Sequence, residues 1–289
     1  MRLLAHCKVN LCLEVLGRRG DGYHDLATVF QTVSPADEFN VEVGGTDIQV
    51  IVTAGEAPAG PENLCWRAAE SYRQLRGWPV GVRIELTKRV PSAAGLGGGS
   101  SDAAATLNAL AALDAQPLEP DDIRRLAAAL GSDVAFFIEG GTALGTGRGE
   151  RLEQLPALDS VSIVLAKPEL AIPTAEAYGM LRAGDFTDGT RAQAMAQVIR
   201  RGGSVAEIAG YVHNAFTAAL THRWPVLRET LDAIKRAGAV AAQVSGSGAA
   251  CFGLFESCEQ AEQAAESLRR AGLWAQAAWT VAYGCEIVC

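Results

Sequence analysis

The sequence lacks three features that would assign the chain to a secreted or membrane class. Its seven cysteines form no C-x-x-C pair, and no run of 18 or more apolar residues occurs. Most cysteines lie in apolar runs, which suits a reducing compartment. At the N-terminus, His6, Lys8 and Asn10 interrupt any apolar signal core. We therefore expect a cytoplasmic protein that is neither secreted nor membrane-spanning.

A basic stripe is also missing. The net charge is −8, from 25 Lys and Arg against 33 Asp and Glu, and no block of like charges occurs. Nucleic-acid-binding proteins usually show a basic surface, so we expect no nucleic-acid partner and no membrane partner. With 289 residues, 49% of them hydrophobic, the chain is long enough for two domains or one large one.

The most informative stretch is a glycine-rich segment that joins a strand pattern to a helix pattern. Apolar residues alternate over 82–86, glycines stand at 95, 97, 98 and 99, and an alanine- and leucine-rich run follows over 102–113. Ser100 and Ser101 are expected to cap that helix. A helix start offers free N–H groups and partial positive charge, and glycine lets the backbone approach an anion. The segment predicts a phosphate-binding loop.

This segment matches neither of the two most familiar phosphate motifs. No Gly-Lys-Ser/Thr follows it, and Ser100 stands where a dinucleotide-binding fingerprint has its third glycine. The alternative is a glycine-rich turn with a purely structural role.

Three further segments carry candidate functional residues. Apolar residues take the odd positions from 3 to 15, so His6, Lys8 and Asn10 share one face of a predicted strand, which is alternatively a solvated face. The turn that delivers Tyr23 and His24 suits recognition of a ring, or is simply a half-buried turn. Asp133 lies among apolar residues and must be paired, capping or catalytic.

The remaining periodicity predicts alternating helices and strands, which indicates an α/β or α+β protein. We expect a domain boundary near 155–158. The predicted helices cover residues 62–75, 102–113, 121–130, 192–200, 205–220, 226–237 and 259–272. The predicted strand-like segments cover residues 3–15, 39–43, 48–52, 82–86, 161–166, 240–244, 249–255 and 274–281, and residues 26–33 form a mixed apolar run.

The glycine segments, in this order, resemble the GHMP small-molecule kinases, whose central motif is Pro-x3-Gly-Leu-x-x-x-Ser-Ser. This resemblance covers nearly the full length of the chain. The motif residues here are Pro91, Gly95, Leu96, Ser100 and Ser101. The other matching segments are Lys8-Val9-Asn10-Leu11, Asp21-Gly22-Tyr23-His24, Gly131-Ser132-Asp133-Val134, Gly140-Gly141-Thr142-Ala143, Gly147-Arg148-Gly149-Glu150 and Ser245-Gly246-Ser247-Gly248.

The resemblance implies an α+β fold of two domains. Residues 1–155 would form an ATP-binding domain related to a ribosomal-protein fold, and residues 156–289 a ferredoxin-like, substrate-binding domain. It implies ATP and Mg²⁺, with no protein metal ligand assigned, and a small-molecule substrate. By the same resemblance, that substrate would be a cytidyl-diphospho alcohol of the non-mevalonate isoprenoid route, phosphorylated on its 2-hydroxyl.

The resemblance also implies the roles of individual residues. Lys8 and Asp133 match the catalytic pair, and Tyr23 and Tyr178 would stack on opposite faces of the cytidine base. The matches to ATP-binding positions are Asn63, Lys88, Pro91, Ser92, Ala93, Ala94, Gly95, Leu96, Gly97, Gly98, Gly99, Ser100 and Ser101. The matches to substrate-binding positions are Asn10, Tyr23, His24, Thr174 and Tyr178.

The chain departs from the family pattern in places. Ala93 and Ala135 replace a frequent glycine and proline, and His213-Asn214-Ala215-Phe216 stands where many relatives carry Asn-Asp-x-Glu. The last departure puts in doubt a polar contact from the C-terminal half.

Alternatives to the cytidyl substrate remain at this point. One is another GHMP kinase acting on mevalonate, homoserine or a sugar, which would not need the aromatic residues Tyr23 and Tyr178. A second is a catalytically silent nucleotide-binding regulator, which the presence of Lys8 and Asp133 disfavours. A third, an RNA-binding module, conflicts with the acidic balance. The sequence leaves open a monomer or a weak homodimer, and the roles of Cys285 and Cys289.

Overall fold

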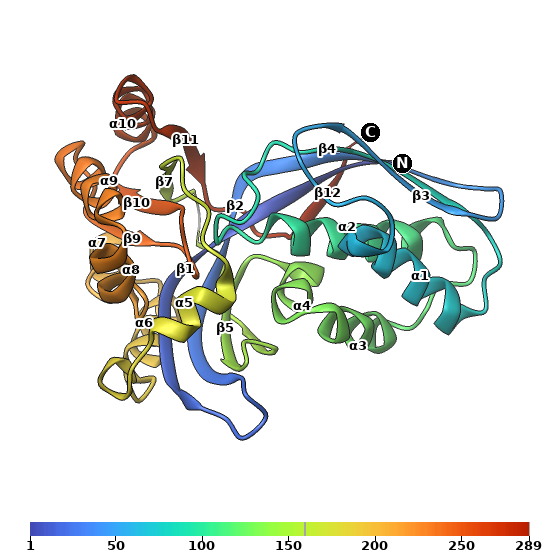
Figure 1. Cartoon of the computed structure of the whole chain (residues 1–289), viewed down its shortest axis with the longest axis horizontal. Helices are drawn as coiled ribbons and strands as arrows, with labels where there is room; N and C mark the ends of the chain where they lie inside the picture. Colours follow the sequence, from blue (N-terminus) through green and yellow to red (C-terminus); the bar gives the residue numbers. More distant parts are fainter. Residues whose placement is uncertain (159, 289) are drawn as a thin grey trace.

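The computed structural model describes residues 1–158 and 160–288, so Cys289 lies outside the described residues. Two β-sheets with helices packed on them make up the molecule (Figure 1). The first sheet has the strand order β12-β1-β2-β4-β3, and β5, β6 and β8 join it at the side. Its strands are β1 (Arg2–Arg18), β2 (His24–Val43), β3 (Ile48–Ala54), β4 (Val82–Thr87), β5 (Thr142–Gly147), β6 (Arg151–Gln154), β8 (His213–Asn214) and β12 (Cys285–Val288).

Four helices lie together against the first sheet, where β1 and β2 run as long curved strands (Figure 1). These helices are α1 (Leu64–Arg76), α2 (Gly98–Leu113), α3 (Pro120–Leu130) and α4 (Ser132–Glu139), with a short 3-10 turn η1 (Gly60–Glu62) before α1. Their apolar faces form one buried cluster with Leu3, Ala5 and Phe30 of the sheet. This cluster is the core that supports the phosphate loop, which we define as residues 91–101.

The second sheet has the antiparallel order β11-β7-β10-β9. Its strands are β7 (Ser162–Lys167), β9 (Ala241–Val244), β10 (Cys251–Phe255) and β11 (Trp274–Trp279). Its connecting helices are α5 (Thr174–Met180), η2 (Ala183–Asp185), α6 (Thr190–Arg200), α7 (Val205–Ala209), α8 (Thr217–Arg223), α9 (Pro225–Arg236) and α10 (Cys258–Arg270). A β-α-β-β-α-β succession with the first and third strands central is the ferredoxin-like arrangement, and the α+β class is confirmed.

The polar face of β1 is buried, so the alternative of a solvated strand face is wrong. His6, Lys8 and Asn10 are each less than 5% exposed. The β1–β2 pairing shifts register between His6 and Cys7. Cys7, Val9 and Leu11 belong to a cluster that includes second-sheet residues such as Phe252. Both faces of β1 are therefore covered, which periodicity along a single strand cannot reveal.

Three local predictions are wrong. The strand expected over 39–43 is the end of a much longer strand, β2, which also includes the mixed apolar run 26–33. The strand continues through Ser34 and Pro35 because they sit at an irregularity in the ladder where proline costs no hydrogen bond. The helix expected over 205–220 is instead α7, β8 and α8. Asn214 interrupts it by donating to the carbonyls of Val244 and Gly246, 2.8 Å away in each case.

The serine caps are the third error. Helix α2 begins at Gly98, with Gly97 as a left-handed N-cap at φ 72° and no side-chain cap. Ser100 and Ser101 therefore lie inside the first turn. In the same way, the N-cap of α4 is Gly131, and Asp133 lies in the first turn of the helix, so Asp133 is not the helix cap.

The chain crosses the expected domain boundary more than once. Strands β8 and β12, from the second half of the sequence, pair with β1 of the first sheet. The division into 1–155 and 156–289 therefore stays a prediction. In the part of the chain that the structure describes, no helix combines the length and apolarity needed to span a bilayer.

Candidate active site

A cavity of about 540 Å³ lies between the phosphate loop, β1, α4 and α5, and a second cavity of about 680 Å³ adjoins it. Leu96 and Ser101 are buried and do not line the first cavity. Tyr23 and His24 line the second one. The predicted site residues around the first cavity are Lys8, Asn10, Asn63, Lys88, Pro91, Ser92, Ala93, Ala94, Gly95, Gly97, Gly98, Gly99, Ser100, Asp133, Thr174 and Tyr178.

Lys8 and Asp133 meet in the first cavity. Lys8 Nζ lies 3.5 Å from Asp133 Oδ2, and it donates to Asn10 Oδ1 at 2.7 Å and to the carbonyl of Gly95 at 3.0 Å. The amide of Asn10 is held in turn by Thr28 Oγ1, 2.8 Å from Nδ2. The lysine side chain is 4% exposed, whereas that of Asp133 is 35% exposed. The cation is thus fixed by buried partners beside a carboxylate that a ligand can reach.

The phosphate loop is anchored on the third glycine segment. Gly95 has φ 76°, and a Cβ there would lie 2.0 Å from the carbonyl oxygen of Ser245. Ser245 Oγ donates to the Gly95 carbonyl at 2.9 Å, and the amide of Ala250 donates to the carbonyl of Ala94 at 2.9 Å. Only glycine fits so close to another backbone. The two sheets therefore meet at this loop.

The first turn of α2 forms the last part of the phosphate loop. Its first intrahelical bond runs from the amide of Ser101 to the carbonyl of Gly97. The amides before it have no partner within the helix, and such groups attract anions. Because Gly97, Gly98, Gly99 and Ser100 line the cavity, this end of the helix suits phosphate binding.

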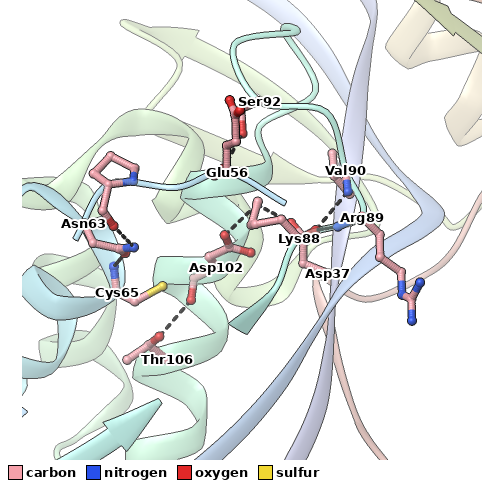
Figure 2. A network of polar contacts seen from close by, with 11 residues as sticks. Asp37, Glu56, Asn63, Cys65, Lys88, Arg89, Val90, Ser92, Asp102 and Thr106 are labelled. Carbon is pink, nitrogen blue, oxygen red and sulfur yellow. Dashed lines mark hydrogen bonds and ion pairs between the residues drawn. The ribbon is translucent and has the colours of Figure 1, made fainter. Parts of the chain in front are cut away.

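An ion network holds both ends of the loop, and sequence reasoning assigned only its lysine (Figure 2). Lys88 Nζ contacts Asp37 Oδ2 and lies 2.7 Å from Asp102 Oδ2. Asp37 Oδ1 accepts the amides of Arg89 and Val90 at 2.6 and 2.9 Å. The network joins the segment before the loop to the helix after it. Asp102 follows the serine pair in sequence and could have been noticed, whereas nothing local distinguishes Asp37.

The charges of this network are strongly coupled. Burial lowers the pKa of Lys88, but the attraction of Asp102 and Asp37 outweighs it and leaves that pKa raised. Burial raises the pKa of Asp102 well above its usual range. Lys88 consequently stays protonated, and its positive charge is paired with Asp37 and Asp102 within the protein.

Asn63 has a structural task in addition to its place at the cavity. It caps α1, with Oδ1 accepting the amide of Cys65 at 2.8 Å and Nδ2 donating to the carbonyl of Pro58 at 2.8 Å. Both ends of its amide are therefore satisfied by backbone groups (Figure 2). Its placement near adenine stays a prediction.

The aromatic residues of the site make contacts that the sequence did not indicate. Tyr178 stacks on His24, with centroids 4.9 Å apart and planes at 29°, so no base fits between these rings. Phe216 packs edge-on against Tyr178 at 4.8 Å. Tyr23 is 57% exposed and lies under the guanidinium of Arg148 at 4.9 Å. The exposed ring of Tyr23 has the guanidinium of Arg148 as its partner, and stacking of a cytidine base between Tyr23 and Tyr178 stays a prediction.

Other groups complete this side of the site. Burial, with a smaller contribution from Asp133, raises the pKa of Tyr178 to about 12, so its hydroxyl stays protonated. Thr174 Oγ1 lies 3.1 Å from Ser247 Oγ of the third glycine segment. The segment 213–216, which differs from the family pattern, supplies Phe216 as an apolar contact for the ring of Tyr178. Sequence reasoning missed this contribution.

The residues of the site suit Mg²⁺ only in combination with phosphate oxygens. Within residues 1–158 and 160–288, no group of three His, Cys, Asp or Glu residues could hold a metal ion. Mg²⁺ in kinases is usually held by one or two carboxylates together with phosphate oxygens. The accessible carboxylate of Asp133 beside the phosphate loop could serve as such a carboxylate, with the phosphate oxygens of ATP supplying the other ligands.

Comparison with known proteins agrees with this geometry. The profile for the GHMP kinases N terminal domain matches residues 63–141, and that for GHMP kinases C terminal matches residues 212–272. A curated 4-diphosphocytidyl-2-C-methyl-D-erythritol kinase from Pelotomaculum thermopropionicum is 42% identical over 269 residues, 92% of this chain and 93% of the relative. One from Deinococcus radiodurans is 41% identical over 278 residues, 95% and 91% of the two chains.

Solved structures show the same relationship. A crystal structure of 4-(cytidine 5'-diphospho)-2C-methyl-D-erythritol kinase is 40% identical, with a TM-score of 0.83 over 97% of this chain and 98% of that one. A homoserine kinase from Cytophaga hutchinsonii has a TM-score of 0.79 at 18% identity, over 100% of this chain and 97% of that one. At that identity, the second match shows a shared fold alone.

Proposed function

This chain belongs to the 4-diphosphocytidyl-2-C-methyl-D-erythritol kinases within the GHMP kinases and is an ATP-dependent small-molecule kinase, and on that premise we propose the reaction it performs. It transfers the γ-phosphoryl group of ATP to the 2-hydroxyl of 4-diphosphocytidyl-2-C-methyl-D-erythritol, in the non-mevalonate route to isoprenoid precursors. The observation that carries this proposal is the Lys8–Asp133 pair, placed between the phosphate loop and the aromatic cavity.

Each group of the pair has a distinct task. Asp133 accepts the proton of the 2-hydroxyl, and the oxygen of that hydroxyl bonds to the γ-phosphorus of ATP. The bond from the γ-phosphorus to the β–γ bridging oxygen breaks, and ADP leaves. Lys8 stabilises the negative charge on the transferring group, because Asn10 and Gly95 already hold its ammonium in place. Phosphoryl transfer depends mainly on positioning and charge stabilisation, so these two groups suffice as the chain's chemical contribution.

The remaining residues bind the two substrates. The phosphate loop and the start of α2 hold the ATP phosphates, with Asn63 and Lys88 on the adenine side. Mg²⁺, when bound, would neutralise phosphate charge, and Asp133 would be the carboxylate that holds it together with phosphate oxygens. Thr174 and Tyr178 from the second half of the chain, with Asn10, Tyr23 and His24 from the first, hold the cytidyl substrate. In this proposal residues 1–155 bind ATP and residues 156–289 contribute to substrate binding.

A substrate panel tests the proposal. The purified protein is incubated with Mg-ATP and, separately, the cytidyl-diphospho alcohol, mevalonate, homoserine, galactose or plain methylerythritol, and ADP release is measured. We expect turnover of the cytidyl compound to exceed that of the others. Comparable turnover of plain methylerythritol, or preference for another alcohol, would show that the substrate assignment is wrong.

Truncation of Tyr178 should affect only the cytidyl substrate. Stacking of a base on one aromatic ring contributes about 1–3 kcal/mol in nucleic-acid sites. Tyr178→Ala removes the ring that supports His24, so the KM for the cytidyl substrate should rise about tenfold or more. Tyr178→Phe, which keeps the ring, is the matched control. Equal losses for ATP and the cytidyl substrate would indicate a core residue instead.

Substitution of Gly98 should affect only ATP. A Cβ at this position would lie 3.3 Å from Lys88 Nζ and 3.3 Å from Val90 Cγ1. The larger side chain in Gly98→Val must therefore occupy the cavity or displace the loop, and we expect about tenfold weaker ATP binding by calorimetry. Urea denaturation serves as the control for folding. Unchanged ATP affinity in a folded variant would reduce the loop to a structural turn.

A further inference from the structure

The segment Gly147-Arg148-Gly149-Glu150 matches the family, but no role follows from that match. In the structure it is a tight turn after β5. Glu150 Oε2 accepts the amide of Arg148 at 2.6 Å, and Gly149 donates its amide to the carbonyl of Thr146 at 3.0 Å. Gly147 has φ 69°, and a Cβ there would lie 2.9 Å from both carboxylate oxygens of Glu150. The glycines and the glutamate thus fix the backbone of Arg148.

The guanidinium of Arg148 is available to a ligand. Among the residues that the structure describes, no carboxylate lies within 4.0 Å of it, whereas Arg19 pairs with Asp21 at 3.1 Å and with Asp25 at 2.7 Å. Its contact is the ring of Tyr23, 4.9 Å from the guanidinium carbon. Stacking on an aromatic face restrains the guanidinium plane without neutralising its charge.

Arg148 stands where the two cavities meet. Of the described residues, four line both cavities: Leu26, Arg148, Thr174 and Tyr178. Arg148 is the cation among them. Lys8 and Lys88 line the first cavity alone, and Arg18 lines the second alone. A ligand that occupies both cavities must therefore pass this guanidinium.

We propose that Arg148 binds the diphosphate of the substrate and sets the enzyme's preference for a diphosphate-linked alcohol. The inference rests on the proposed function, in which cytidine contacts His24 and Tyr178 and the reacting hydroxyl lies at Asp133. The diphosphate joins those two parts, so it crosses the junction with its negative charges facing the guanidinium. The planar fork of arginine matches phosphate oxygens and forms paired, charge-assisted hydrogen bonds.

Binding of cytidine, CMP and CDP to the full-length protein, measured by titration calorimetry, tests the role of Arg148. The unaltered protein should bind CDP more tightly than cytidine. Arg148→Met should reduce that preference about tenfold or more and leave cytidine affinity nearly unchanged, as expected for loss of hydrogen bonds to a charged group. Arg148→Lys, which keeps the charge and loses the fork, should lie between. Arg151→Met, in an exposed residue of the neighbouring strand, is the matched control and should keep the preference.

Three results for Arg148→Met would overturn the inference. The first is an unchanged preference for CDP, and the second is an equal loss of cytidine and CDP binding. The third is a loss of ATP binding while cytidine and CDP binding are retained. The second would mean that Arg148 acts through Tyr23, and the third that it serves ATP. Failure of the proposed function is separable, because these measurements need no turnover. A preference for CDP that depends on Arg148, in a protein that does not phosphorylate the cytidyl alcohol, would support this inference and refute only the reaction.

Discussion

Asp133→Asn is expected to lower turnover of the cytidyl substrate about 10²–10⁴-fold, the usual effect of removing a general base. Asparagine has nearly the same shape and cannot accept the hydroxyl proton. Lys8 keeps its bonds to Asn10 and to the Gly95 carbonyl in this variant, so the phosphate side of the cavity should be unchanged. Steady-state kinetics should show a fall in kcat with little change in the affinity for ATP.

A matched substitution separates chemistry from helix stability. Asp121 lies in the first turn of α3, as Asp133 does in α4, but it is exposed and lines neither cavity. Asp121→Asn should therefore retain normal turnover. Near-normal turnover of Asp133→Asn would remove this residue from the role of base. A rise in the KM for ATP without a change in kcat would point to a binding role instead.

Lys8→Met is expected to lower turnover about 10²–10³-fold, the scale observed when a preorganised donor to developing negative charge is removed. Methionine keeps most of the apolar stem, so packing around β1 should survive. The loss leaves Asn10 Oδ1 without its donor, whereas the Gly95 carbonyl still accepts from Ser245 Oγ. A modest loss of stability, about 1–3 kcal/mol, should accompany the kinetic effect.

Kinetics and urea denaturation distinguish these two effects of the Lys8 substitution. The folded variant should bind both substrates and turn them over slowly. Lys235→Met, in the last turn of α9 and outside both cavities, is the control for loss of a positive charge. If Lys8→Met retained near-normal turnover, charge stabilisation would have to come from another group. Of the described residues, Lys88 and Arg148 are the other Lys and Arg side chains that line this cavity.

Long amphipathic elements could be predicted from the sequence because their signal is local. The helices expected at 226–237 and 259–272 are confirmed as α9 (Pro225–Arg236) and α10 (Cys258–Arg270). The predicted helix at 205–220 failed for the opposite reason. Strand β8 exists only because it pairs with β1, and Asn214 is held by carbonyls of a distant segment. A window along the chain contains neither partner.

The candidate site likewise has features that the local sequence predicts and features that depend on distant segments. The glycine-rich turn before α2 was predictable because its glycines and the helix start are neighbours in sequence, and its role in phosphate binding stays a prediction. Which glycine begins the helix was not predictable, since Gly97 takes a left-handed conformation against Phe137 and Lys8. The two hydrogen bonds that Gly95 and Ala94 accept from Ser245 and Ala250 depend on the second sheet.

The sequence by itself determined the residue types that phosphoryl transfer uses and the segments that carry them, because composition, periodicity and glycine spacing are properties of the chain. The tertiary structure decided which of them meet. It put the lysine of β1 beside the carboxylate of α4, Asp37 on Lys88, His24 on Tyr178, and Arg148 at the junction of two cavities. Such distances depend on burial of apolar surface shared by both sheets, a long-range effect that no local pattern records.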